Sequence, residues 1–312
     1  MRTIFFRALA LLAVIILVPS STQVTADSNS FLYLPIVGKN QNQPADVAII
    51  ADHTSVNLKN VPPAYIDKAK RELHIYYGHT SHGSQLVTGM SGLVTFANNG
   101  GLGLDLPANF FSGLDLTEGG NDAGYYPTWV NQTRAYLGTP DPVTGRGRSH
   151  PNTNVVMWSW CGQVSDISES TLISNYLQPM SQLEIDYPGI QFVYMTGHSD
   201  GTGETGNLHL RNQQIRQYAI NNHKVLFDFY DIELYDPDGN YYGDKKVDDG
   251  CNYDSDNNGS RDKNWASLYQ STHQQNVDWY SCSCAHSVAL NCNQKAYAAW
   301  YLMARLAGWN GE

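Results

Sequence analysis

The chain has 312 residues and a formal net charge of −10, with 29 acidic against 19 basic side chains and no cluster of Lys or Arg. A nucleic-acid partner is therefore not expected, because phosphate binding requires a basic footprint. Aromatic residues are abundant, with 20 Tyr and 7 Trp. Exposed rings of this kind could stack on sugars, although most rings in a globular protein belong to the core.

The first 26 residues have the pattern of a secretory signal peptide. Arg2 and Arg7 supply positive charge, residues 8–18 form an apolar run, and residues 24–26 form a cleavage site of small residues. The apolar run is short for a membrane span. We expect a secreted, extracellular or cell-surface protein with no stable membrane insertion after cleavage. An uncleaved N-terminal anchor is the alternative.

Residues 27–46 are interpreted as an N-terminal linker and residues 47–312 as one large domain. Apolar runs bounded by Gly and separated by helical patterns predict βαβ units and a mainly parallel sheet. The expected strands cover residues 73–77, 154–158, 190–195 and 224–229. The expected helices cover residues 85–97, 166–179, 208–222 and 291–308. The predicted fold class is α/β, a three-layer α/β/α sandwich.

Three of the expected boundaries rest on capping signals. Asp166 with Glu169 is interpreted as an N-cap and its partner, and Pro179 as a kink or end of that helix. Asn291 with Gln294 predicts the start of the last helix. Gly308 predicts the C-cap of that helix. Two long irregular regions, residues 98–150 and 235–290, are expected to be insertions at the carboxyl edge of the sheet.

Five cysteines in an exported chain predict two disulfides and one free thiol. Four of them lie in the last quarter, and Cys161 is expected to be unpaired because it is distant and follows a strand. Spacing does not define the connectivity. No C-x-x-C pair is present, so a zinc ribbon is not indicated.

The turn over residues 78–84 carries the main catalytic signal. It joins a predicted strand to a predicted helix, which places Ser81 at the carboxyl edge, where ligands bind in parallel sheets. The N–H groups at the start of the next helix would stabilise an oxyanion there. The alternative is that Ser81 only caps that helix.

A serine nucleophile needs a base, and His286 directly precedes the last predicted helix. A loop entering the final helix of a parallel-sheet domain can return to the same edge. The alternative is an ordinary loop histidine.

This placement, together with the string His-Thr-Ser-His-Gly at residues 79–83, resembles a divergent, secreted bacterial-type member of the SGNH/GDSL hydrolases over residues 72–308. The resemblance implies a flavodoxin-like sheet, Ser81 as nucleophile and oxyanion donor, and His286 as base. It also implies a Gly and an Asn in the oxyanion hole. The positions corresponding to those residues are Gly120 for the Gly, and Gly162 or Gln163 in place of the Asn.

The acidic residue of the family is not where the resemblance would place it. Three residues before His286 the chain has Ser283 instead of Asp. Either the site is a Ser–His dyad or another carboxylate orients the imidazole. The candidates are Asp228, Asp231 and Asp278.

His198 follows another predicted strand and should face the same edge as His79 and His82. These residues are predicted to contact the substrate. One alternative is that His198 serves as the base in place of His286. Another is a zinc site in which these imidazoles converge with His286 and Asp200.

Asp254, Asp256, Asn258 and Asp262 resemble a calcium loop with oxygen ligands at alternate positions. Trp265 occupies the twelfth position, where such loops have a bidentate Glu. The loop predicts a structural Ca²⁺ site, and an Asx-rich turn is the alternative.

The leading hypothesis is a secreted carboxylic ester hydrolase that removes acyl groups, such as acetyl, from a polysaccharide or small ester, with no cofactor required for catalysis. The second is a non-catalytic glycan- or surface-binding protein on the same scaffold. The third is a metal-dependent hydrolase.

Overall fold

The computed structural model describes residues 47–312, so the predicted signal peptide and linker lie outside the described residues. Six parallel strands form the central sheet in the order β1–β6–β5–β4–β2–β3. The strands are β1 (Ile49–Ala51), β2 (His74–Gly78), β3 (Asp115–Gly119), β4 (Val155–Trp158), β5 (Gln191–Met195) and β6 (Val225–Phe227). The predicted α/β class is confirmed.

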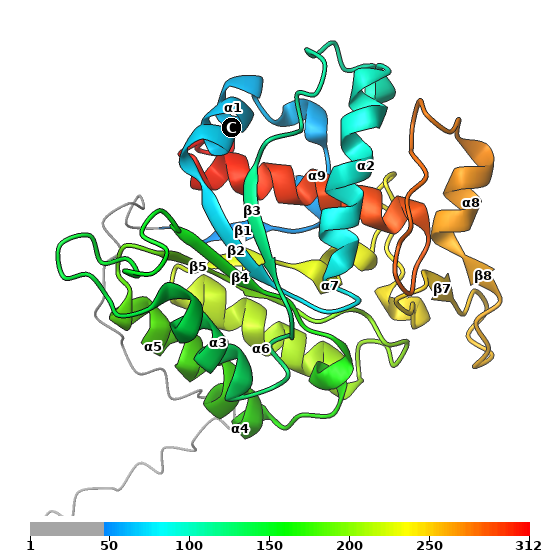
Figure 1. The fold of residues 1–312 in the computed structure, drawn as a ribbon. Coiled ribbons are helices and arrows are strands. Elements are labelled where there is room, and N and C mark those ends of the chain that lie inside the picture. The colour runs from blue at the N-terminus through cyan, green and yellow to red at the C-terminus, as the bar shows by residue number, and fades with distance from the viewer. Residues whose placement is uncertain (1–46) are drawn as a thin grey trace, which may run out of the picture. The chain divides into compact units, whose positions relative to one another are not determined.

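Helices cover both faces of this sheet, as a three-layer sandwich requires. In Figure 1, α1, α2 and α9 lie on one face, and α3 to α6 lie on the other. The helices are α1 (Pro63–Glu72), α2 (Ser84–Asn98), α3 (Thr128–Leu137), α4 (Glu169–Leu172), α5 (Gln178–Asp186), α6 (Asn207–Asn221), α7 (Phe229–Glu233), α8 (Trp265–Thr272) and α9 (Ala289–Leu306). A small antiparallel pair, β7 (Asn252–Tyr253) and β8 (Lys263–Asn264), lies within the region 235–290.

The inner strands consist of apolar residues because both of their faces are covered. Every residue of β4 and β6 is buried, and so are four of the five residues of β5. The outer strand β3 is different, since its sequence Asp-Leu-Thr-Glu-Gly has no buried position. This polar edge strand lies inside the region 98–150, where the sequence predicts no strand. The short strand β1 and helix α1 are also absent from the predicted elements.

Two predicted boundaries are wrong. Ser168, not Asp166, caps α4, because its hydroxyl accepts the N–H of Thr171. The chain then continues through a π-helical segment over residues 173–177 into α5, so Pro179 does not end the helix but lies within a continuous helical stretch, two residues after the π segment. The last helix starts at Ala289 rather than Asn291. Gly308 follows it with φ +100°, as the predicted C-cap requires.

Within residues 47–312, no helix combines the length and the apolar character needed to cross a membrane.

Candidate active site

Three loops meet at the carboxyl edge around β2, which has β3 on one side and β4 on the other. The loop after β2 is tied to the end of β3, because the N–H of His79 donates to Gly119 O at 3.1 Å. The loop after β4 is tied to both neighbours. The N–H of Ser159 donates to Gly78 O at 3.0 Å, and Ser159 O accepts from Ala123 at 2.8 Å. The strand order reverses at β2, which is the usual ligand-binding position in open α/β sheets.

Gly83 allows the first of these loops to lie against the third. A Cβ at Gly83 would overlap with the side chain of Ser159 and with Cβ of His79. Gly83 is the N-cap residue of α2, and no side chain accepts a capping hydrogen bond there. Ser81 therefore does not cap this helix through its hydroxyl. Its carbonyl oxygen instead accepts from the hydroxyl of Ser84 at 2.6 Å.

Cys161, His82 and Asp249 form a continuous chain of polar contacts at this edge. Sγ of Cys161 lies 3.3 Å from Nδ1 of His82. Nε2 of the same ring lies 3.0 Å from Oδ2 of Asp249. A thiol, an imidazole and a carboxylate in this order have the geometry of a nucleophile, its base and the group that orients the base. Cys161 is unpaired, as predicted.

Two further imidazoles stack on His82. The His198 ring lies 3.7 Å from it and the His286 ring 4.4 Å, centroid to centroid. Burial lowers the pKa of His82 below 6.5, and although Asp249 acts in the opposite direction, the two neighbouring imidazoles also lower it. Burial alone would raise the pKa of Asp249, but the hydrogen bond with His82 and the charges of the nearby imidazoles lower it. At neutral pH, His82 is therefore a neutral base and Asp249 beside it is an ionised carboxylate.

Ser81 lies in the same cluster but contacts the thiol rather than an imidazole. Its Oγ is 3.8 Å from Sγ of Cys161. Among residues 47–312, the ring of His286 forms no hydrogen bond, and its one ring contact is the stack on His82. The structure therefore brings Ser81 and His286 to the same edge without joining them directly.

The remaining residues predicted to bind substrate lie at different distances from this cluster. The side chain of Gln163 accepts the N–H of Cys161 at 3.2 Å and packs over Gly124. Gly162 begins a 3-10 turn over residues 162–165 and is exposed. Gly120 is exposed, with open space where a Cβ would be. His79 turns toward β3 and pairs with Glu118, Nε2 to Oε2, at 2.8 Å.

The three carboxylates proposed to orient His286 have other partners. Asp228 and Asp231 bind Arg216, and Asp231 also pairs with His53 beside β1. Asp278 accepts the N–H of Gln274 at 2.8 Å within its own turn. The carboxylate that reaches the histidine cluster is Asp249, which the sequence analysis did not single out. It lies in an Asp-rich loop with no local motif, so only its spatial position identifies it.

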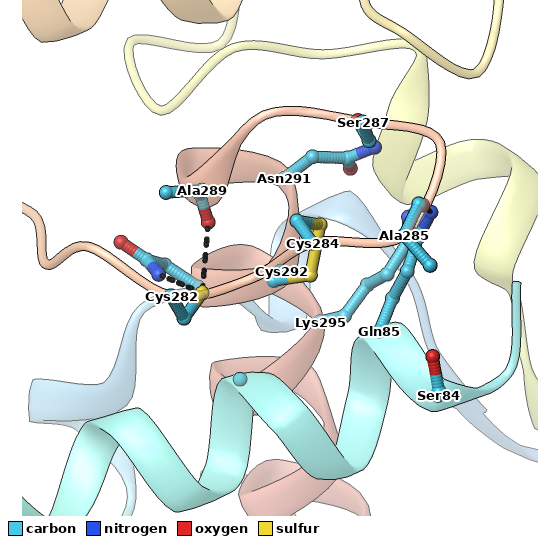
Figure 2. The surroundings of a disulfide bond; sticks show 12 residues. Ser84, Gln85, Cys282, Cys284, Ala285, Ser287, Ala289, Asn291, Cys292 and Lys295 are labelled. Carbon is cyan, nitrogen blue, oxygen red and sulfur yellow. Dashed lines mark hydrogen bonds between the residues drawn. A yellow bond between two sulfur atoms is a disulfide. The ribbon is translucent and has the colours of Figure 1, made fainter. Parts of the chain in front are cut away.

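The loop that carries His286 is tied to α9 by a disulfide and to α2 by a hydrogen bond. Cys284 and Cys292 form a disulfide across it, shown in Figure 2 above the buried Lys295. The side chain of Gln85 donates to Ala285 O at 2.5 Å. The expectation of two disulfides is not met, because Cys251 and Cys282 are both unpaired. Cys251 is buried beside Ser287, and Cys282 contacts Ala289 and Asn293, so the two thiols have separate surroundings.

A buried ion pair lies beneath the cluster. Nζ of Lys295 is 2.6 Å from Oε1 of Glu233, and both side chains are fully buried. Lys295 also donates to Gln85. Glu233 accepts the N–H of Ser199, the residue after His198, at 2.6 Å. Asn291 links Glu233 at 3.3 Å to the backbone oxygen of Asp249 at 3.4 Å. One charged pair thus supports three of the loops that carry the candidate residues.

The predicted calcium loop forms a network of Asx turns. Both carboxylate oxygens of Asp254 accept backbone N–H groups, from Asn258 at 3.1 Å and Gly259 at 2.8 Å. Asp256 binds Asn258, and Asp262 binds Ser255. Among the described residues, the groups of three His, Cys, Asp or Glu side chains that are close enough to hold a metal ion lie elsewhere. Calcium binding stays a prediction.

A cavity of about 330 Å³ lies away from this cluster, near the starts of β1, β4 and β5. It is lined by residues such as Ile49, Arg146, Asn154 and Trp309, and by none of the cluster residues. It contains no candidate nucleophile, so the carboxyl edge is the better candidate for chemistry.

The fold and the cluster together define a parallel-sheet α/β protein with a Cys–His–Asp arrangement at its strand-order reversal. No protein-family model and no curated protein matches this chain.

Proposed function

We propose that this protein is an acyl hydrolase that cleaves carboxylic esters, with Cys161 as nucleophile, His82 as base and Asp249 as the residue that orients the base. The observation that carries the proposal is the pair of contacts on one imidazole, 3.3 Å to the thiol and 3.0 Å to the carboxylate. The function expected from sequence, a secreted ester hydrolase, is kept, but the geometry favours a different nucleophile.

The proposed reaction has two steps. His82 Nδ1 takes the thiol proton, and the sulfur of Cys161 attacks the ester carbonyl, so that a C–S bond forms and the C–O bond to the alcohol breaks. The alcohol leaves with the proton from His82. Water, deprotonated by the same nitrogen, then attacks the thioester and releases the acid and the free thiol. Asp249 keeps the second ring proton on Nε2 throughout, which leaves Nδ1 free to accept.

The oxyanion of each tetrahedral intermediate needs N–H donors. Gln163 occupies the N–H of Cys161. Gly162 and the residues after it begin the 3-10 turn, and the first N–H groups of a helical turn have no partner within it. We assign Gly162 as the first oxyanion donor.

A second nucleophile is supported by one specific contact. Ser81 Oγ lies 3.8 Å from Sγ of Cys161, and His286 packs against His82 in the same cluster. A serine mechanism of the SGNH type would require Ser81 and His286 to turn toward each other. That mechanism is the second candidate function, on the same substrates.

The expected substrate class, acylated polysaccharide, is supported by an exposed aromatic pair. Tyr125 and Tyr126 are 53% and 45% exposed. They follow Asp122, whose carboxylate accepts the hydroxyl of Thr80, the residue before Ser81, at 2.8 Å. Exposed rings beside a hydrolytic site suit sugar stacking.

Substitution of the proposed nucleophile tests the function directly. Cys161→Ala should lower kcat/KM for p-nitrophenyl acetate by about a thousandfold or more, because the attacking atom is lost. Cys282→Ala removes another unpaired thiol outside the cluster and is the matched control. Thermal melting of all variants checks that they fold.

The outcomes separate the candidates. If Cys161→Ala keeps full activity and Ser81→Ala loses it, together with covalent labelling by a fluorophosphonate, the serine mechanism holds. If the wild-type protein neither turns over esters nor takes up a thiol- or serine-directed acylating probe, the hydrolase proposal is wrong and a non-catalytic glycan-binding role is favoured.

A further inference from the structure

We propose that His82, Asp249 and His286 form a binding site for a divalent transition-metal ion such as Zn²⁺, and that the bound ion inhibits the hydrolase. The inhibition rests on the proposed function, whereas the binding does not. One ligand atom from each of these three residues lies within 4.8 Å of the other two. Two imidazoles and a carboxylate are a donor set that suits zinc.

The size of the cluster is close to that of a zinc site. At Zn–N and Zn–O distances of about 2.0–2.2 Å, the ligand atoms of a tetrahedral ion lie roughly 3.3–3.6 Å apart. Nε2 of His82 and Oδ2 of Asp249, 3.0 Å apart, are already slightly closer than that, and the ligand atom of His286, at most 4.8 Å from the others, must move in by roughly 1.5 Å at most. His286 must also turn out of its stack on His82, because an ion lies near the plane of each imidazole that binds it. His286 is exposed, and its ring has no hydrogen bond to break among residues 47–312, so this rotation has a low cost.

One neighbouring group, His198, offers a further ligand once its ring tilts out of its stack on His82. Nδ1 of His198 donates to Ser199 O at 2.7 Å, which leaves Nε2 as a bare acceptor. That nitrogen is buried and unpartnered within the described residues, and it faces Gly162, since a Cβ there would lie 3.9 Å away. An imidazole held through its other nitrogen by a backbone carbonyl is the usual arrangement of a metal ligand. The Cys161 thiol lies 3.3 Å from Nδ1 of His82, on the other side of the ring from Nε2, so it stays outside an ion held at Nε2.

A metal ion in this site would prevent His82 from acting as the base. An ion bound at Nε2 of His82 replaces the contact with Asp249 and leaves the ring proton on Nδ1. That nitrogen faces the thiol and can then no longer accept its proton. Asp249 is at the same time withdrawn from orienting the ring. Metal binding should therefore stop turnover without displacing the nucleophile.

The test is calorimetric titration of the chelator-treated full chain with Zn²⁺. We expect one ion per chain, with affinity at least tenfold weaker in Asp249→Asn and in His286→Asn. His223→Asn is the matched control. His223 is an exposed histidine near the start of β6, and both it and His286 have positive φ, at 51° and 62°, a conformation that Asn tolerates. The control should bind like the wild type.

Cobalt and turnover add two separate measurements. With Co²⁺ in place of Zn²⁺, no sulfur-to-cobalt charge-transfer band is expected, and a band that is lost in Cys161→Ala would overturn binding at Nε2 of His82. Ester turnover should fall in proportion to zinc occupancy and return with chelator. No stoichiometric binding, or equal affinity in His286→Asn and the wild type, overturns the metal site. Stoichiometric binding by a chain that turns over no ester leaves the site standing and removes the hydrolase.

Discussion

Gly83 shows how one residue without a side chain can decide the geometry of the candidate site. The loop bearing Ser81 and His82 lies directly against the loop bearing Cys161, and Gly83 is the point of contact with Ser159. Any larger residue would force the two loops apart and lengthen the contact between His82 and Cys161. The position of the His82 ring therefore depends on Gly83 as well as on the contacts of His82 with Cys161 and Asp249.

Substitution of Gly83 by Ala should destabilise the protein and reduce turnover together. We expect a loss of about 1–3 kcal/mol in the free energy of unfolding, the usual cost of overpacking, measured by urea denaturation. Gly120→Ala is the matched control, because its added Cβ meets open space on the neighbouring loop. Equal stability of Gly83→Ala and Gly120→Ala would show that the close approach to Ser159 is not required.

At the scale of elements, the pair of Lys295 in α9 and Glu233 in α7 joins the histidine loops from below. Burial lowers the pKa of Lys295, and Glu233 opposes this effect. A buried ion pair of this kind contributes little net stability compared with an apolar pair, but loss of one partner leaves a charge without compensation. Its position suggests a role in holding the loops of Ser199, Asp249 and Ala285 in register.

Glu233→Gln should lower the free energy of unfolding by about 3–5 kcal/mol, because Lys295 stays buried without its counter-charge. Glu72→Gln removes an exposed partner of Lys68 and should change it by less than about 1 kcal/mol. Chemical denaturation measures both. Replacement of both partners, in Glu233→Gln with Lys295→Met, should recover part of the loss. No recovery would indicate that the hydrogen bonds of Glu233, rather than the charge of Lys295, dominate.

At the scale of the whole molecule, His53 links the end of the edge strand β1 to Asp231 in α7. Burial alone would lower the pKa of His53, but the hydrogen bond and the charge of Asp231 raise it above 6.5. A histidine whose pKa is raised on folding stabilises the protein fully below its unfolded pKa. That stabilisation is lost as the pH rises through the folded pKa.

The difference in unfolding free energy between the wild type and His53→Gln should therefore be larger at pH 6 than at pH 8. Denaturation of both proteins at the two pH values measures it. The lowered pKa of His82 makes the protein less stable as the pH falls below 6.5, which is opposite to the effect of His53. Because His82 is present in both proteins, its effect cancels in the difference between the wild type and His53→Gln. A difference that is constant, or that grows toward pH 8, contradicts the proposed pairing of protonated His53 with Asp231.

The class of fold and the edge that carries the site follow from local sequence. Four apolar segments separated by helical patterns predict the inner parallel strands, because residues buried on both faces must be apolar whatever else surrounds them. The strand-turn-helix pattern at residues 78–84 likewise places Ser81 and His82 at the carboxyl edge. The outer strands β1 and β3 are not predicted in this way. Strand β1 has only three residues and β3 is a polar edge strand, so neither has a distinctive apolar pattern.

The partners within the site were decided only by the tertiary structure. His82 meets Cys161 and Asp249 across 79 and 167 positions of the chain. Asp249 lies in a long insertion with no periodic pattern. From the sequence alone, Cys161 is identified only as an unpaired thiol that follows a strand. The folding of the insertions over the sheet decides which carboxylate lies beside which imidazole. Such contacts join segments that are far apart in the chain, so the residues around each partner carry no local pattern that predicts them.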